Sequence, residues 1–412
     1  MKNWSQSNSF YIGFQQMTAA MRHEIRLIFS DAGVLIILFA VPLIYPVLYS
    51  FIYYPEVVRD LPIAVFDESA SAQSRSYLRN LDATPEVSIA AHVRSMDEAA
   101  RLFREGKVRG IVQIPSTFSD DIALGRQATV SAYADMEFFL YYKALVTGAS
   151  FVTLETGRNI QIRNLTKTGY TDRQAEVTAE PLKLVENAMA NPAGGFASYG
   201  IPAALILIIQ QTLVLAIGII AGSIREKQSG SVPKIIEYGG PGEIIRQLIG
   251  KAVVYFLIYA VLCQFMLGLI PSWFGYPRNA DFIEIGILIT PFLLSSIFLG
   301  QFLSVFFKNR ESAMLLYLFT SIPLLFLSGV IWPLSNFSPL WQMVRALFPS
   351  SDAMTGYIKL NSLGAATGEI SKETGLLWVM TAAYFVLAFM AHFFIHIRSK
   401  HLREEVIGTD MN

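Results

Sequence analysis

The side chains best suited to catalysis or metal binding form no complete set in this sequence. His392 and His396 lie four residues apart and share one face of a helix, with His401 beyond, but no carboxylate or third ligand is fixed beside them. A histidine pair at a membrane interface explains them better than a zinc site. Gly250-Lys251 lacks the earlier glycine and the following Ser or Thr of a Walker A motif. We therefore expect no metal site, no bound cofactor, and no ATPase or other catalytic site in this chain.

A charged segment, residues 223–251, separates two apolar runs that are each about long enough to cross a bilayer as a helix. Ser231 is suited to cap a short helix, and the Gly-Gly-Pro-Gly turn at 239–242 would end that helix after Tyr238. The helix would present Ile235, Ile236 and Tyr238 at the membrane surface, where they could fill a groove of a soluble partner. A plain connector is the alternative.

The residues of this segment resemble the loop of type-2 ATP-binding cassette (ABC) permeases. The positions that carry the resemblance are Arg225, Glu226, Gly230, Ser231, Pro241, Glu243, Gly250 and Lys251. The family has Thr where this chain has Ser231, and a Ser-Pro turn where it has Gly240-Pro241. The resemblance implies a membrane subunit that binds cytosolic ATPase subunits through this loop. Those subunits would hold ATP and magnesium, and a second permease subunit, identical or a paralogue, would complete the transporter.

The composition is that of an integral membrane protein, because 53% of the residues are hydrophobic, 16% are charged and the mean hydropathy is +0.43. Six apolar runs are candidate spans, namely residues 32–53, 201–222, 252–271, 283–307, 312–332 and 375–397. Residues 10–30 have apolar positions at three- and four-residue spacing, which predicts an amphipathic helix in the membrane interface. We expect contact with lipid and none with nucleic acid.

Basic residues in the short connections predict the orientation. They gather before the first run, in the segment 223–251, between the fourth and fifth runs, and after the sixth. The positive-inside rule then places both termini in the cytoplasm and residues 55–198 outside the inner (plasma) membrane.

Four glutamines lie inside the apolar runs, namely Gln210, Gln211, Gln264 and Gln301. Polar side chains at membrane depth are costly, so we expect them to face protein or a cavity. They could line a substrate path, or they could hydrogen-bond neighbouring helices. No run has Asp, Glu, Lys or Arg at its centre, which disfavours a secondary transporter coupled to an ion. Gly218 and Gly222 form a small-residue pair suited to close helix packing.

Residues 55–198 have the pattern of an inserted α/β domain. Strands are predicted at 61–66, 87–93, 108–114 and 129–134, with helices at 71–82, 96–105 and 116–124 between them. Two long helices, at 137–163 and 171–189, would return the chain to the membrane. Short matches at 66–68, 74–75, 108–110, 114–115 and 118–119 resemble the large extracytoplasmic insert of one branch of these permeases.

The predicted protein therefore has three parts: an elbow helix and first span at 1–54, the insert at 55–198, and five further spans at 199–412. The segment around Gly329, Trp332, Pro333 and Trp341 is too apolar for a free loop, and short helices dipping into the outer leaflet are predicted there. It resembles the outer gate of the permease family, and an aromatic interface anchor is the alternative. The fold class is a polytopic α-helical membrane protein with six transmembrane helices and an extracytoplasmic α/β domain.

The function implied by the resemblance is that of the permease subunit of an ABC exporter, with a hydrophobic or amphipathic substrate such as a drug, a lipid or a cell-envelope precursor. A receptor or scaffold that binds a partner through its external domain, without transport, is the first alternative. A secondary transporter is the second. A neighbouring gene for a soluble protein with a Walker A motif would favour the exporter over both.

The predicted orientation can be tested with single added cysteines. Cysteines at Asp82 and Asp172 should react with an impermeant thiol reagent in intact cells, whereas one at Gln228 should not, because only the first two lie in the predicted external insert. Cys263, the only native cysteine, lies within an apolar run and supplies the background signal. Reaction at Gln228 without reaction at the other two positions would invert the orientation.

Overall fold

The computed structural model describes residues 2–54, 56–182, 197–228 and 240–410, together with 184, 185, 187, 191, 194 and 195. It divides into a helical unit, Met1–Glu56 with Ala188–Asn412, and a second unit, Val57–Asn187. The second unit lies within the predicted insert, 55–198. Ser198 belongs to the helical unit, where its hydroxyl donates to the Glu56 carboxylate at 2.7 Å. This hydrogen bond joins the segment that leaves the helical unit to the segment that returns to it.

The helical unit contains the six predicted spans, which are long and apolar enough to cross a bilayer. They are Ala32–Ile52, Gly200–Lys227, Pro241–Phe274, Phe282–Ser304, Arg310–Leu327 and Thr367–Arg398. Their helices, with the shorter ones beside them, are α1 (Lys2–Ser30), α2 (Ala32–Leu35), α3 (Val41–Ile52), α9 (Ala197–Gln228), α10 (Pro241–Cys263), α11 (Ile270–Phe274), α12 (Phe282–Ser304), α13 (Arg310–Leu327), α14 (Pro339–Arg345), α15 (Pro349–Tyr357) and α16 (Ser371–Asp410).

Several helix boundaries of the helical unit differ from the prediction, among them the following two. The fifth span ends at Leu327 rather than 332, because Gly329 adopts a φ of +87°, which stops a helix. The first helix begins at Lys2 rather than at residue 10, so the polar residues before 10 continue the helix.

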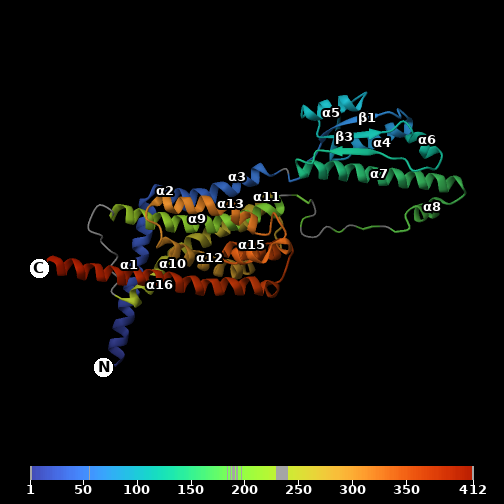
Figure 1. Ribbon diagram of the computed structural model, residues 1–412. Coiled ribbons are helices and arrows are strands. Elements are labelled where there is room, and N and C mark those ends of the chain that lie inside the picture. The colour runs from blue at the N-terminus through green and yellow to red at the C-terminus, as the bar shows by residue number, and fades with distance from the viewer. Residues whose placement is uncertain are drawn as a thin grey trace. The chain divides into compact units, whose positions relative to one another are not determined.

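The centre of the helical unit is α9, whose most apolar 18-residue stretch has 89% of its residues buried. It packs against α3, α12, α13 and α15, and Figure 1 shows it running alongside the other long helices. The glycine pair, Gly218 and Gly222, lies where α9 comes close to α13. A β-carbon on Gly218 would come within 2.8 Å of Ala313, and one on Gly222 within 2.5 Å of the Asn309 carbonyl oxygen. The predicted close packing surface therefore faces the start of α13.

Two spans contain a π-helical turn before a proline. One turn is Ile36–Ala40, ahead of Pro42, and the other is Gln264–Leu269, ahead of Pro271. Proline at 271 removes the N–H that would bond the carbonyl of Leu267. That carbonyl instead accepts a hydrogen bond from the Tyr357 hydroxyl at 3.2 Å, so α15 supplies the partner that the third span lacks.

The second unit is the predicted α/β domain. Its strands are β1 (Leu61–Asp67), β2 (Val87–His92), β3 (Gly110–Ile114) and β4 (Ser131–Ala134), in the order β2-β1-β3-β4, with β4 antiparallel to β3 and the other pairs parallel. The connecting and flanking helices are α4 (Ala72–Asp82), α5 (Met96–Arg104), α6 (Phe118–Ala123), α7 (Phe139–Lys167) and α8 (Asp172–Ala179).

Alternation along β1 gives the sheet two cores. Leu61, Ile63 and Val65 pack with side chains of α4 and α7, whereas Ala64 packs with those of α5 on the other face. The predicted long helix at 171–189 is wrong, because α8 ends at Ala179. A proline disfavours the helical conformation for the residue before it. Glu180, which precedes Pro181, accordingly has a non-helical φ of −134°.

The glycine contact predicts a specific loss of stability. Gly222→Ala should cost about 1–3 kcal/mol, because its β-carbon overlaps a backbone oxygen that cannot move aside alone. Gly286→Ala, in α12 with nothing within 4 Å of the added carbon, is the matched control. Thermal unfolding in detergent should show a lower midpoint for the first variant only. Equal midpoints would mean that α9 and α13 do not pack closely there.

Candidate functional site

The predicted coupling residues that the structure describes lie where α9 ends and where α10 begins. Arg225 is near the end of α9, and its guanidinium donates to the carbonyls of Ser304 and Phe307, both at 2.5 Å. These carbonyls belong to the end of α12 and the connection to α13, where helix ends leave acceptors unpaired. Arg225 therefore ties α9 to the neighbouring pair of spans, while Glu226 is exposed.

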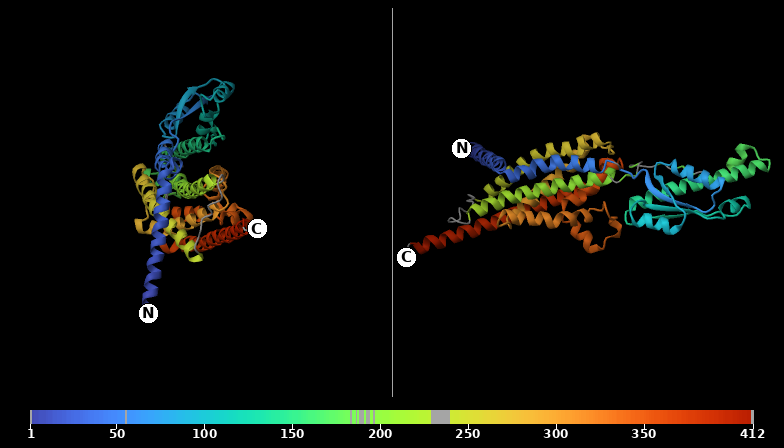
Figure 2. Two further views of the ribbon diagram at one scale, coloured as in Figure 1. Left: turned by 90° about the vertical axis from the view of Figure 1, so that its left-hand side faces the viewer. Right: turned by 90° about the horizontal axis from the view of Figure 1, so that it is seen from above.

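The start of α10 packs against α1, which runs across the direction of the long helices (Figures 1 and 2). Pro241 occupies the first turn of α10, and Glu243 in the same turn accepts from Gln247 at 3.2 Å. At Gly250 the two helices are closest, since an added β-carbon would lie 2.9 Å from the carbonyl oxygen of Met17.

A buried carboxylate, that of Glu24, holds this contact. Glu24 is 2% exposed and lies on α1. It accepts from the Tyr255 hydroxyl at 2.7 Å and lies 3.5 Å from the ammonium nitrogen of Lys251. A buried charge is tolerated only with such partners. The role of Lys251 in this structure is thus to compensate Glu24.

Sequence reasoning did not identify Glu24 or Tyr255. The signal was present on α1, because Met17, Met21, Glu24 and Ile28 follow three- and four-residue spacing, and Glu24 interrupts this apolar stripe. An acidic side chain in the buried stripe of an interfacial helix indicates a partner, although the stripe does not tell which helix supplies it.

A third contact joins the start of α13 to the junction between α1 and α2. Arg310, the first residue of α13, donates to the carboxylate of Asp31 at 2.8 Å. Asp31 also caps α2 by accepting from the backbone of Gly33 and Val34. Together, the Arg225, Glu24 and Asp31 contacts join α1, α9, α10, α12 and α13 at one end of the bundle. We call them the end ring.

The remaining predicted loop residues, Gly230, Ser231, Ile235, Ile236 and Tyr238, lie outside the described residues, as does the short helix predicted at 231–238.

Three of the four glutamines hydrogen-bond neighbouring helices. Gln210 accepts from the backbone of Ser350 at 2.6 Å, and so supplies a partner in the first turn of α15. Gln211 donates to Thr320 at 3.3 Å, and Gln301 donates to the carbonyl of Leu248 at 3.1 Å. Gln264 is exposed at the start of its π-helical turn. These contacts match the alternative considered from sequence, and a substrate path remains a prediction.

The predicted outer segment forms short helices. Gly329 ends the preceding span, and Trp332, Pro333 and Trp341 are exposed. The helix α14, which contains Trp341, is joined to α15 by a charged contact. Arg345 donates to the carbonyl of Ser351 at 2.8 Å and lies 3.5 Å from the carboxylate of Asp352. Next to this pair, Lys359 lies 2.6 Å from Glu373.

Burial governs the ionisation of the Arg345–Asp352 pair. It raises the pKa of Asp352 above its usual value, and the nearby Arg345 opposes the rise while Glu373 adds to it. It also lowers the pKa of Arg345, an effect that Asp352 and Glu373 oppose. The carboxylate of Asp352 therefore depends on the nearby Arg345 cation to remain ionised.

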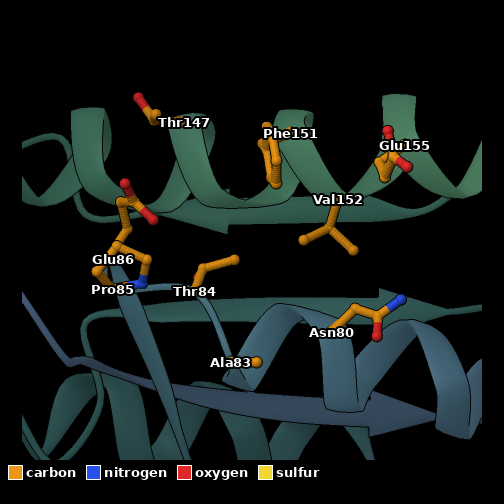
Figure 3. Close-up of a pocket in the computed structure, with 9 residues that line it drawn as sticks. All are labelled: Asn80, Ala83, Thr84, Pro85, Glu86, Thr147, Phe151, Val152 and Glu155. Atoms are coloured by element: carbon orange, nitrogen blue, oxygen red, sulfur yellow. The ribbon is translucent and has the colours of Figure 1, made fainter.

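The second unit contains a pocket of about 600 Å³ between α7 and the connection from α4 to β2 (Figure 3). Phe151 and Val152 contribute apolar surface, and the carboxylates of Glu86 and Glu155 lie at opposite ends. No residue of this pocket was predicted from sequence. The only signal is the four-residue spacing of Thr147, Phe151 and Glu155 along one face of α7.

Among the residues that the structure describes, no group of three or more His, Cys, Asp or Glu side chains is placed to hold a metal ion. His392 lies with its Nδ1 2.9 Å from the carbonyl oxygen of Ala388, one turn earlier in the same helix.

The fold and the end ring define a polytopic helical membrane protein with an α/β domain inserted after its first span. The family described as ABC-2 family transporter protein matches residues 32–390, and the chain belongs to that family. The match includes all six spans except the last eight residues of the sixth, together with the whole insert. The comparison with curated proteins gave no match.

The Arg345–Asp352 pair predicts a pH-dependent variant. Arg345→Met should destabilise the protein by about 3–5 kcal/mol at neutral pH, because it leaves the Asp352 carboxylate buried without its cation. The pKa of Asp352, already raised, should rise further. The folded state then holds this proton to a higher pH than the unfolded chain, so stability falls as the pH rises through that interval.

Thermal unfolding in detergent between about pH 5 and pH 7 measures this effect, and the variant should recover stability on acidification. The double variant, Arg345→Met with Asp352→Asn, is the control and should lose that recovery. A single variant whose pH dependence equals that of the double variant would exclude Asp352 as the titrating group.

Proposed function

We propose that this chain is the permease subunit of an ABC exporter and moves a hydrophobic or amphipathic substrate, such as a drug, a lipid or a cell-envelope precursor, out of the cell. A separate cytosolic subunit would hold ATP and magnesium and hydrolyse the nucleotide. The family match across residues 32–390 is the observation that supports this proposal most directly. Membership in this family implies an ATP-binding cassette partner and more than one permease copy.

The loop at 223–251 is the proposed docking element for the ATPase. Its two ends are fixed in different ways, α9 by Arg225 to the end of α12 and α10 by Glu24 to α1. A force applied to the loop would therefore reach four spans and the interfacial helix through hydrogen bonds and ion pairs. A flexible attachment would lose such a displacement in local rearrangement, so a fixed one suits mechanical coupling.

The proposed setting is the inner (plasma) membrane, with both termini in the cytoplasm and the α/β unit outside. The distribution of basic residues between the short connections supports this orientation. The second permease subunit would be a copy of this chain or a paralogue.

The docking role predicts a loss of the partner. Ile235→Asp with Ile236→Asp should weaken ATPase binding by more than about tenfold, because each buried isoleucine contributes about 1.5–3 kcal/mol. Glu226→Ala, at an exposed position, should leave the spans folded and uncouple hydrolysis from transport. ATPase co-purification and transport are measured in membranes that contain equal amounts of permease.

The matched control changes another adjacent apolar pair on the same proposed side, Val406→Asp with Ile407→Asp. It should retain both the ATPase and transport. If the loop double variant also retained the ATPase, and it and Glu226→Ala both transported normally, the loop would be a connector only. The receptor alternative would then be favoured.

A further inference from the structure

Large apolar side chains are exposed together where β4 leads into α7. Met136, Phe138, Phe139 and Leu140 are 66%, 52%, 68% and 39% exposed. We call these four residues the β4–α7 patch. Neighbouring polar contacts fix the turn that presents it. The carboxylate of Asp135 accepts from the backbone of Glu137 at 2.9 Å, and Arg109 lies 3.5 Å from the same carboxylate.

Strand register places the patch at one edge of the sheet. Ala134, the last residue of β4, pairs with Gly110, the first residue of β3, and Gly110 pairs with Ile63 near the start of β1. Neighbouring strands lie about 4.8 Å apart, so the end of β4 lies about 10 Å from the start of β1. The reversed direction of β4 therefore brings the patch to the edge where β1 enters the domain.

The chain ties that edge to the membrane. The first span ends at Ile52, and β1 begins at Leu61, so only residues 53–60 lie between the bilayer and the sheet. At about 3.3–3.6 Å per residue this connector reaches at most about 30 Å. It begins with Tyr53 and Tyr54, both exposed, which are side chains typical of a membrane interface.

We propose that the β4–α7 patch inserts into the lipid surface at which the first span ends. The short connector joins that interface to the edge of the sheet that carries the patch, and the aromatic and methionine side chains of the patch gain from leaving water at headgroup depth. Arg109 brings a cation to its rim, 5.5 Å from the ring of Tyr141, where lipid phosphates lie. The proposal requires neither the exporter function nor a particular orientation, because the span and the sheet edge share one membrane surface in either case.

Quenching by spin-labelled lipids tests this insertion on the full chain in lipid nanodiscs. An environment-sensitive thiol dye is attached at Met136→Cys or, as the matched control, at Leu124→Cys. Leu124 is 65% exposed and lies in the connection from β3 to β4, at the opposite edge of the sheet. Cys263 is buried, and the unaltered chain gives its background. We expect loss of emission at 136 when the lipids carry the spin label, and none at 124.

A second pair of variants separates lipid contact from other causes. Phe139→Glu should abolish the quenching at 136, whereas Phe151→Glu, at a phenylalanine of α7 with 65% exposure, should leave it unchanged. An absence of quenching at 136, or equal quenching at 124, would overturn the proposal. A blue-shifted dye at 136 that spin-labelled lipids do not quench would also overturn it, because protein, such as a second copy of this chain, would then cover the patch.

Discussion

The buried carboxylate of Glu24 constrains how α1 and α10 pack at one end of the helical bundle. A charge at 2% exposure must be compensated, and its partners Lys251 and Tyr255 both come from α10. The interfacial helix is thereby held to the third span next to Gly250, where the backbones are in contact. The Arg225 and Asp31 contacts lie at the same end of the bundle and join α9 to the end of α12 and α13 to the α1–α2 junction.

The spans and the inserted domain could be predicted from sequence because both depend on local patterns. Apolar runs of sufficient length fix the six helices, and alternating strands and helices fix the α/β class. The end ring could not be predicted, because Glu24 and Tyr255 are 231 residues apart and no local period relates them. The hydroxyl of Tyr357 on the Leu267 carbonyl is likewise a pairing that only the assembled bundle specifies.

Local chemistry explains the places where the prediction was wrong. Pro181 ended α8 ten residues before the predicted boundary, and Gly329 ended the fifth span early. The backbone preferences of proline and glycine are known, so both helix ends could have been predicted from the sequence. The prediction followed the hydrophobic pattern instead. No direction was predicted for β4, because a four-residue strand has no signal for parallel or antiparallel pairing.

The third span is held by contacts with other helices at two points along its length. Near its start it is held to α1 by residues 250–255, and beyond its middle the Leu267 carbonyl is held by Tyr357 of α15. At about 1.5 Å per residue, the Glu24 contact lies about 15–20 Å from the start of α10 at Pro241 and about the same distance from Leu267. The Glu24 contact therefore lies about midway between the start of α10 and Leu267. If the span tilts as a rigid body about this contact, a displacement of the start of α10 moves Leu267 by a similar amount in the opposite direction.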